Sequence, residues 1–256
     1  MRLSCGQKVF LGKLLCDDSR FGYEEIRMQV YLLSVKELVY SPDDNPMNAV
    51  LAVRLRQRAI KMLDEHRREK VNNLKTEVAQ SQAIGAGLLL QLAVQNERPD
   101  NDEVMELSVS EILEKLHEPI QIDYVYDIYG KPDFADASWH FNLSHSGEYV
   151  CLVTDNNPVG VDIQQMRPLK NYHLAERFFS EKELAKMESC INEGEKVECF
   201  YDIWVKKESY AKLTGEGIGK TVGLDTEYAG LPVCWRVLDE PEGYRVAICK
   251  AITEAG

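Results

Sequence analysis

The sequence predicts an α+β protein with two related lobes. In each half of the 256-residue chain, helical segments come before short strands, and this grouping of elements is typical of α+β proteins. Hydrophobic residues make up 45% of the chain, which is enough to bury a sizeable core and argues against global disorder. We expect an N-terminal appendage over residues 1–27, a first lobe over 28–157 and a second lobe over 158–256.

The first half is expected to alternate between one strand, long helices and a loop. Met28 to Val35 is apolar and predicts a strand. Ile84, Leu88 and Leu92 recur at a spacing of four, which predicts a helix. The other expected elements are a helix over 48–73, the helix just described over 76–96, a loop marked by Pro99 and the acidic stretch 100–106, and a short helix over 110–116.

The second half is expected to be richer in strands. Ser180 and Glu183 form a capping box that predicts a helix start, and Gly215 is expected to end a helix that begins near residue 196. The expected strands are 121–128, 139–143, 149–154, 159–163, 234–238 and 244–250.

Composition limits the classes of function and the compartment. A net charge of −12 argues against a protein that coats nucleic acid or an anionic membrane, although a local basic pocket remains compatible with it. The seven cysteines are odd in number and contain no Cys-x-x-Cys pair, so we expect reduced thiols and a cytoplasmic location. The N-terminus lacks the pattern of a signal peptide, and the most apolar run, 83–94, is too short to span a bilayer.

The segment Val159 to Gln164 is the first candidate for chemistry. Alternate residues of a strand share a face, so Asp162 and Gln164 are expected to point the same way while Val161 and Ile163 point into a core. Two oxygen-bearing side chains on one face can converge on a single cation such as Mg²⁺. The structural alternative is an ordinary solvated aspartate at the end of a strand.

The segment Trp204 to Gly215 is the second candidate. On a helix, Trp204, Glu208 and Lys212 are spaced by four residues and therefore lie on one face. The structural alternative is a buried tryptophan followed by an exposed ion pair, which contributes only a few tenths of a kcal/mol, roughly.

The third candidate combines the turn Gly130-Lys131-Pro132 with the run Asn142 to Gly147. Its cation, hydroxyls and imidazole are groups that can bind phosphate oxygens. A serine hydrolase is disfavoured because the chain has no Gly-x-Ser-x-Gly elbow, and because Ser144 and His145 would point to opposite faces of a strand.

Taken together and in this order, these segments resemble the 4′-phosphopantetheinyl transferase superfamily, in particular its larger, pseudo-dimeric type. The resemblance covers about 130–217, is looser before residue 120 and does not include 1–27. The segments that carry it are Gly130-Lys131-Pro132, Phe141 to Gly147, Gly160-Val161-Asp162-Ile163, Arg177-Phe178-Phe179-Ser180 and Trp204 to Gly215.

The resemblance implies a fold of two pseudo-symmetric lobes, each a small antiparallel sheet packed with helices, and a metal site at the lobe interface. It implies an enzyme that transfers 4′-phosphopantetheine from coenzyme A to a serine of an apo carrier protein and releases 3′,5′-ADP. It also implies a Mg²⁺ cofactor, an acyl or peptidyl carrier protein as partner and a monomeric state, without nucleic acid or membrane.

The resemblance also assigns roles to residues. Asp162 and Glu208 would bind the metal, Glu208 would in addition act as general base, and Lys212 would stabilise charge on the phosphates. The residues implied to bind coenzyme A are Lys131 and Pro132 beside the adenine, Ser144, His145, Lys207 and Lys212 at the phosphates, and Arg68 and Lys70 at the 3′-phosphate.

One position departs from the family pattern. Many members carry glutamate two residues after the aspartate, whereas this chain has Gln164, a neutral and weaker ligand for Mg²⁺. Either Gln164 binds the metal weakly or a water takes its place. Gln164 is the main support for one rival function, a non-catalytic relative that binds coenzyme A or a nucleotide. A second rival is a general metal-dependent nucleotide hydrolase on a similar scaffold.

Overall fold

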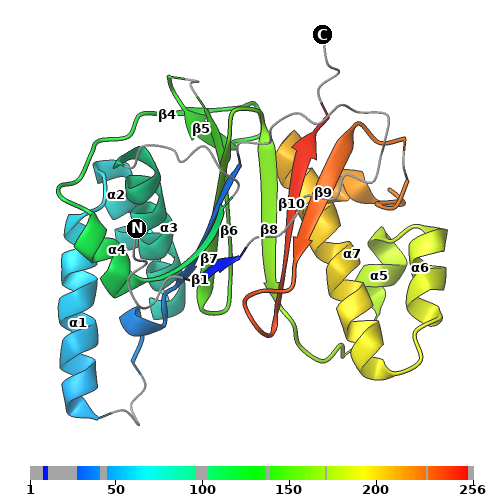
Figure 1. The fold of residues 1–256 in the computed structure, drawn as a ribbon, viewed down its shortest axis with the longest axis horizontal. Helices are drawn as coiled ribbons and strands as arrows, with labels where there is room; N and C mark the ends of the chain where they lie inside the picture. Colours follow the sequence, from blue (N-terminus) through cyan, green and yellow to red (C-terminus); the bar gives the residue numbers. More distant parts are fainter. Residues whose placement is uncertain are drawn as a thin grey trace.

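The computed structural model describes residues 8–10, 28–40, 45–95, 103–136, 139–170, 172–228 and 230–252. Two sheets lie back to back in the middle of the molecule, and helices cover the outer side of each (Figure 1). The expected α+β class is therefore confirmed. Apart from the strand Lys8–Phe10, the predicted appendage 1–27 lies outside the described residues.

The first sheet has five strands in the order β1-β3-β2-β7-β6. These are β1 (Lys8–Phe10), β2 (Gln29–Ser34), β3 (Glu103–Ser108), β6 (His140–Ser146) and β7 (Tyr149–Asp155). The neighbours pair antiparallel except β2 and β3, which are parallel, so this sheet is not purely antiparallel as expected.

Four helices cover the outer face of the first sheet: α1 (Pro46–Lys61), α2 (Glu65–Asn73), α3 (Glu77–Gln95) and α4 (Val109–Lys115). Leu33 and Val150 from the sheet are buried together with Ile84 and Leu88 of α3 in one core cluster. A 3-10 turn, η1 (Lys36–Leu38), precedes α1, and a hairpin of β4 (Tyr124–Tyr126) and β5 (Pro132–Phe134) lies beyond α4 in the chain.

The second sheet has three strands in the order β8-β10-β9, all antiparallel. They are β8 (Val159–Gln165), β10 (Tyr244–Ala251) and β9 (Val233–Leu238), and the helices on their outer side are α5 (His173–Phe178), α6 (Glu181–Glu188) and α7 (Glu193–Thr214), followed by the 3-10 turn η2 (Ile218–Thr221). Val161 and Ile163 of β8 are buried against Val30 and Val153 of the first sheet, so a second core fills the space between the sheets.

Side chains of β6 join the edge strand of the first sheet to β8 of the second. Asn142 Oδ1 accepts the N–H of Val161 at 2.9 Å, and Ser146 Oγ accepts the N–H of Gln165 at 3.0 Å. Between them, Ser144 Oγ accepts the N–H of Ile163 at 3.2 Å. These three bonds, at every second residue of β6, take the place of a backbone ladder and hold β8 beside it.

Two predicted elements of the first half are corrected. The single helix expected over 48–73 is two helices, because Asp64 caps a new one by accepting the N–H of Arg67 at 3.0 Å. The loop expected over 100–106 contains most of β3: Val104 and Leu107 are buried, and the Glu106 carboxylate accepts the Tyr149 hydroxyl at 2.9 Å.

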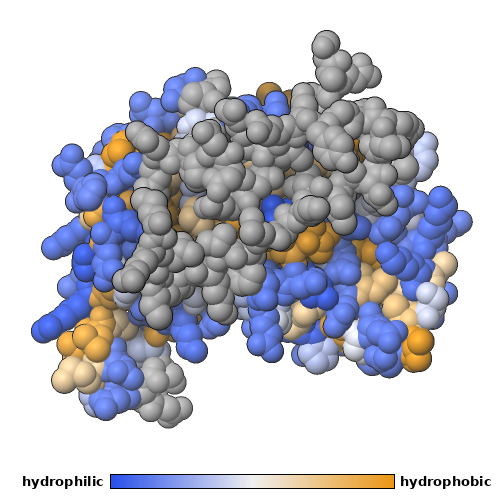
Figure 2. Space-filling model, viewed as in Figure 1, coloured by the Kyte–Doolittle hydropathy of each residue, from blue (hydrophilic) through white to orange (hydrophobic). Residues whose placement is uncertain are grey.

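The surface carries an apolar area on helix α1. On the face shown in Figure 2, hydrophobic residues gather over the lower part of α1, where Met47, Val50, Leu51 and Val53 are exposed. Within the described ranges, no helix is long and apolar enough to cross a bilayer.

Candidate active site between strand β8 and helix α7

Asp162 is fixed on the face of β8 that is turned toward α7. Val161 and Ile163 point into the core between the sheets, as the alternation predicted, so Asp162 points the other way, and it is only 2% exposed. The helix comes very close here: a Cβ on Gly160 would lie 2.5 Å from the backbone nitrogen of Leu213. Only glycine allows β8 and α7 to touch, which brings the polar groups of both elements together.

The carboxylate of Asp162 is the centre of a polar cluster. Its Oδ1 accepts Lys212 Nζ at 2.7 Å and Ser144 Oγ at 2.8 Å. Lys212 Nζ also donates to Ser144 Oγ at 2.7 Å, so the three groups form a closed triangle. The second oxygen, Oδ2, accepts Gln164 Nε2 at 3.1 Å. Asp162 is thus ion-paired and hydrogen-bonded, and the solvated-aspartate alternative does not describe it.

Glu208 lies one turn before Lys212 on α7, and its charge interacts with those of Asp162 and Lys212. Desolvation raises the pKa of Glu208, the negative charge of Asp162 raises it further, and Lys212 opposes both. In the part of the chain that the structure describes, the Glu208 side chain has no hydrogen-bond or ion-pair partner. A partly buried carboxyl group beside a second carboxylate is an arrangement that a divalent cation stabilises.

The donor set fits Mg²⁺ but lacks a complete cage. The described residues contain no group of three or more His, Cys, Asp or Glu side chains that could hold a metal. Mg²⁺ is commonly held by one or two carboxylates together with waters and phosphate oxygens, which is what Asp162 and Glu208 offer. Gln164 turns its amide nitrogen to Asp162, and its Oε1 lies 3.5 Å from the Ser146 hydroxyl that donates to it.

Cationic groups gather beside this cluster. His145 follows Ser144 on β6, and desolvation, together with the nearby charges of Lys212 and Lys70, lowers its pKa. Desolvation and the charge of Arg67 likewise lower the pKa of Lys70 on α2. The first-lobe helix α2 therefore brings positive charge to a site built mainly by β6, β8 and α7. Arg68, also on α2, is exposed.

Lys131 lies in the β4–β5 hairpin, and its amine is hydrogen-bonded to backbone oxygens of the protein. Its Nζ donates to the backbone oxygens of Val159 at 3.3 Å and Leu213 at 3.2 Å. Burial lowers the pKa of Lys131, against the opposing charges of Asp133 and Asp127. Lys131 therefore ties the hairpin to the start of β8 and the end of α7, while Pro132 begins β5 beside it.

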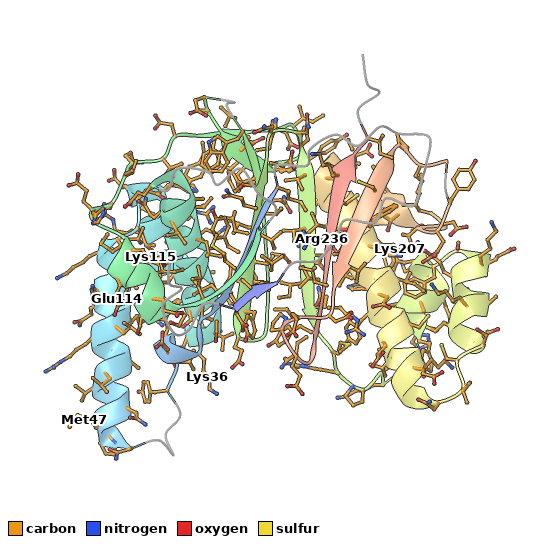
Figure 3. All side chains as sticks on the ribbon, in the orientation of Figure 1. Lys36, Met47, Glu114, Lys115, Lys207 and Arg236 are labelled. Carbon is orange, nitrogen blue, oxygen red and sulfur yellow. The ribbon has the colours of Figure 1, made fainter. Side chains whose placement is uncertain are left out.

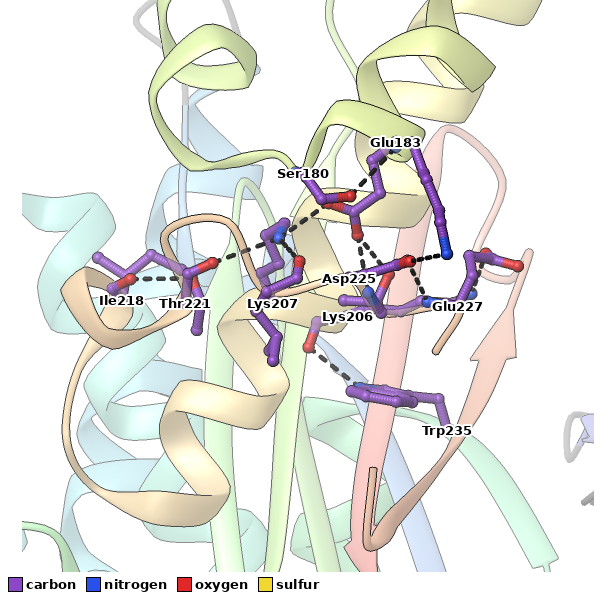
Figure 4. A network of polar contacts seen from close by, with 12 residues as sticks. Ser180, Glu183, Lys206, Lys207, Ile218, Thr221, Asp225, Glu227 and Trp235 are labelled. Atoms are coloured by element: carbon purple, nitrogen blue, oxygen red, sulfur yellow. Dashed lines mark hydrogen bonds and ion pairs between the residues drawn. The ribbon is translucent and has the colours of Figure 1, made fainter. Parts of the chain in front are cut away.

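The structure does not bring Lys207 to the site, which corrects its predicted phosphate role. Lys207 is fully buried on the side of α7 turned away from β8 (Figure 3). Its Nζ pairs with Glu183 of α6 at 2.9 Å and donates to the backbone oxygens of Thr221 and Leu224 (Figure 4). Because neighbouring residues of a helix point about 100° apart, Lys207 and Glu208 cannot both face β8.

Asn142 and Ser146 help to build the site, although the sequence motifs that contain them did not reveal their individual roles. Asn142 and Ser146 accept backbone N–H groups of β8, as described above. The available signal was the repetition of polar residues at every second position of β6, Asn142-x-Ser144-x-Ser146, which marks a polar strand face.

The chain is similar to known proteins over this region. Residues 158–249 match the sequence profile of the 4′-phosphopantetheinyl transferase superfamily. The chain is 34% identical over 137 residues to 4′-phosphopantetheinyl transferase ffp of Bacillus subtilis, covering 48% of this chain and 60% of that protein. It is 32% identical over 139 residues to 4′-phosphopantetheinyl transferase Sfp of Bacillus subtilis (strain 168), covering 48% of this chain and 60% of that protein.

A relative from another bacterium gives the same result. The chain is 37% identical over 110 residues to 4′-phosphopantetheinyl transferase AcpT of Escherichia coli O157:H7, covering 41% of this chain and 55% of that protein. The matches thus span about 60% or less of the length of these three relatives. The resemblance noted in the sequence is confirmed at the level of the superfamily.

Proposed function

Since this chain belongs to the 4′-phosphopantetheinyl transferase superfamily, we propose that it transfers the 4′-phosphopantetheine group of coenzyme A to a serine of an apo carrier protein. One observation carries the proposal. Asp162 and Lys212 pair where β8 touches α7, and Glu208 interacts electrostatically with both, inside the segment 158–249 that matches the superfamily. The partner is an acyl or peptidyl carrier protein, and a cytoplasmic location stays a prediction.

Asp162 and Glu208 would hold Mg²⁺, with Gln164 nearby. When bound, the cation would supply neutralising charge for the pyrophosphate of coenzyme A. Asp162 Oδ1 already accepts two hydrogen bonds, whereas Oδ2 accepts one and keeps a free acceptor position. Because the amide nitrogen of Gln164 is used on Asp162, a water in place of a direct Gln164 contact suits this donor set.

Side chains of this protein account for the proton transfer and for stabilisation of the charge on the leaving group. The carrier serine Oγ attacks the β-phosphorus of coenzyme A, a new phosphorus–oxygen bond forms, and the bond to the bridging oxygen of the pyrophosphate breaks. The serine proton passes to Glu208, directly or through water. The departing 3′,5′-ADP keeps the electron pair of the broken bond, and Lys212 and His145 stabilise the charge on its phosphates.

Mass spectrometry of apo carrier proteins tests the proposal. A small panel of fatty acid, polyketide and peptide carriers is incubated with coenzyme A, Mg²⁺ and this protein. We expect at least one carrier to become heavier by one phosphopantetheine while an equal amount of 3′,5′-ADP appears. A carrier whose acceptor serine is replaced by alanine is the matched control and should stay unmodified.

Gln164 favours one second candidate, a non-catalytic relative that binds coenzyme A. Coenzyme A binding without labelling of any carrier would support that candidate. Breakdown of coenzyme A without carrier labelling would instead indicate a hydrolase. Either result would contradict the transferase proposal.

A further inference from the structure

The hydroxyl of Ser144 has no hydrogen-bonding capacity left. A serine hydroxyl carries one proton and two acceptor positions. Ser144 Oγ accepts the N–H of Ile163 at 3.2 Å and Lys212 Nζ at 2.7 Å, and it donates its proton to Asp162 Oδ1 at 2.8 Å. All three positions are therefore taken by the protein itself.

Because these groups are buried, replacing their hydrogen bonds by bonds to a phosphate is unfavourable. Ser144 is 5% exposed and Asp162 is 2% exposed. A phosphate oxygen is an acceptor, so it would need the one proton that Asp162 already receives. Taking that proton away would leave a buried carboxylate with one hydrogen bond fewer, which is unfavourable in a poorly solvated site.

His145 is differently placed. It points to the other face of β6, is exposed, and lies near the charges of Lys212 and Lys70. It is therefore accessible to an anionic ligand in a way that Ser144 is not.

From this geometry we infer that Ser144 is a positioning residue, which holds the Asp162 carboxylate, the Lys212 amine and β8 in register and leaves phosphate binding to His145 and the lysines. The inference rests on the proposed function and revises the role that the family resemblance implied for Ser144. Asn142 and Ser146 make the same kind of bond to β8, but only Ser144 reaches Asp162 and Lys212.

Three variants separate positioning from phosphate binding: Ser144→Ala, His145→Ala and Ser146→Ala. The last is the matched control, because it removes the bonds of Ser146 to the N–H of Gln165 and to Gln164 Oε1 but leaves the contacts of Asp162 with Ser144 and Lys212 in place. The measurements are kcat and KM for coenzyme A, the dissociation constant of coenzyme A without metal, and the midpoint of thermal unfolding.

We expect Ser144→Ala to lower kcat by about 10–100-fold, as is usual when a residue that orients a ligating side chain is removed. Its metal-free dissociation constant for coenzyme A should stay within about twofold of the unsubstituted protein, since ground-state binding is retained. His145→Ala should weaken metal-free binding and raise KM. Ser146→Ala should lower the unfolding midpoint no more than Ser144→Ala does, because Ser146 is less buried, and it should lower kcat far less.

Two results would overturn the inference: a normal kcat in Ser144→Ala, or metal-free binding weakened as strongly as in His145→Ala. If Ser144→Ala does not fold, Ser144→Cys keeps the side-chain volume with a weaker hydrogen-bonding group and carries the same expectations. Failure of the proposed function is distinguishable, because it would appear as absence of carrier labelling by the unsubstituted protein. The metal-free binding and unfolding measurements would then still test Ser144.

Discussion

The groups around Glu208 shift the pKa of its carboxyl group in opposite directions. Desolvation and the charge of Asp162 raise its pKa, while Lys212 lowers it. A general base must be ionised to accept a proton, so a raised pKa moves the pH at which the base becomes active upward. The same contacts that fit Glu208 for binding a cation therefore also set the pH range in which it can work.

The pH profile of kcat tests the role of Glu208. We expect activity to fall as the pH drops and Glu208 becomes protonated, because protonation removes both the base and a metal ligand, and we expect added Mg²⁺ to move this fall to lower pH because the cation favours the ionised carboxylate. Glu208→Gln should fold normally and lose at least about 100-fold in kcat, the usual contribution of a general base. The matched control is Glu216→Gln, an exposed carboxyl group just beyond α7, which should leave the profile in place. A near-normal rate in Glu208→Gln would reject the base and ligand roles together.

Gln164 allows a second test at the scale of one residue. Replacing it by glutamate adds a carboxylate beside Asp162 in place of the amide that now donates to it. We expect Gln164→Glu to reduce the Mg²⁺ concentration for half-maximal activity by about 3–10-fold, since a carboxylate is the stronger ligand. Without metal, the variant should be less stable because two carboxylates then repel each other.

The control for this test is Gln165→Glu, which adds the same charge one residue along, on the other face of β8. Titration of Mg²⁺ with both variants and the unsubstituted protein provides the comparison. Equal metal requirements in all three would remove the idea that Gln164 weakens metal binding.

At the scale of elements, the strand and helices that hold the site residues were predicted better than the elements that pack against them. The alternation in β8 and the capping box of α6 are confirmed, because each depends on local periodicity or on a bond three residues away. The strand nature of β3 was missed, because its acidic residues indicate a loop and its partner β2 lies about 70 residues earlier in the chain. The burial of Lys207 was missed because its partner, Glu183, belongs to a different helix.

The pair of Lys207 and Glu183 holds α6 and the segment after η2 against α7. Glu183 also accepts the N–H of Thr226 at 3.0 Å and its hydroxyl at 2.7 Å, while Lys207 donates to Thr221 and Leu224. Both members of the ion pair are fully buried. A charge left there without its partner is strongly unfavourable, so this network secures the outer face of the helix that carries Glu208 and Lys212.

Neighbouring lysines give a matched pair for testing this network. Lys207→Met should reduce the free energy of unfolding by about 3–5 kcal/mol, because Glu183 is left buried and unpaired. Lys206→Met removes a partly exposed pair with Glu227 and should cost no more than about 1 kcal/mol. Denaturant titration compares the two. At a temperature where Lys207→Met stays folded, its KM for coenzyme A should be normal. A raised KM would indicate that Lys207 contacts the phosphates after all.

At the scale of the whole molecule, charge limits how partners approach. The chain carries a net charge of −12, and coenzyme A and many carriers are also anionic. The positive charge at the site is local, from Lys212 and Lys70 near His145, with Arg67 near Lys70. We therefore propose that carrier docking depends more on apolar contacts than on long-range attraction. Because β6, β8, α2 and α7 of one chain build the site, a monomer remains the predicted functional unit.

Ionic strength tests this view of docking. Between about 0.05 and 0.5 M NaCl, the KM for a modified carrier should change by less than about threefold, since screening affects mainly exposed and distant charges. The KM for coenzyme A, measured in parallel, should rise more because its phosphates meet lysines directly. A steep increase of the carrier KM with salt would contradict docking through apolar contacts.

The absence of a side chain at Gly160 sets how the reactive groups can move. Since β8 lies directly on the backbone of α7 there, no water layer or rotamer change separates the strand from the helix. The backbone positions that carry Asp162 on one element and Glu208 with Lys212 on the other are therefore held at a close spacing by this direct contact. Under the proposed function, adaptation to different carriers would therefore involve surfaces farther from this contact, and the spacing of the reactive groups would stay the same.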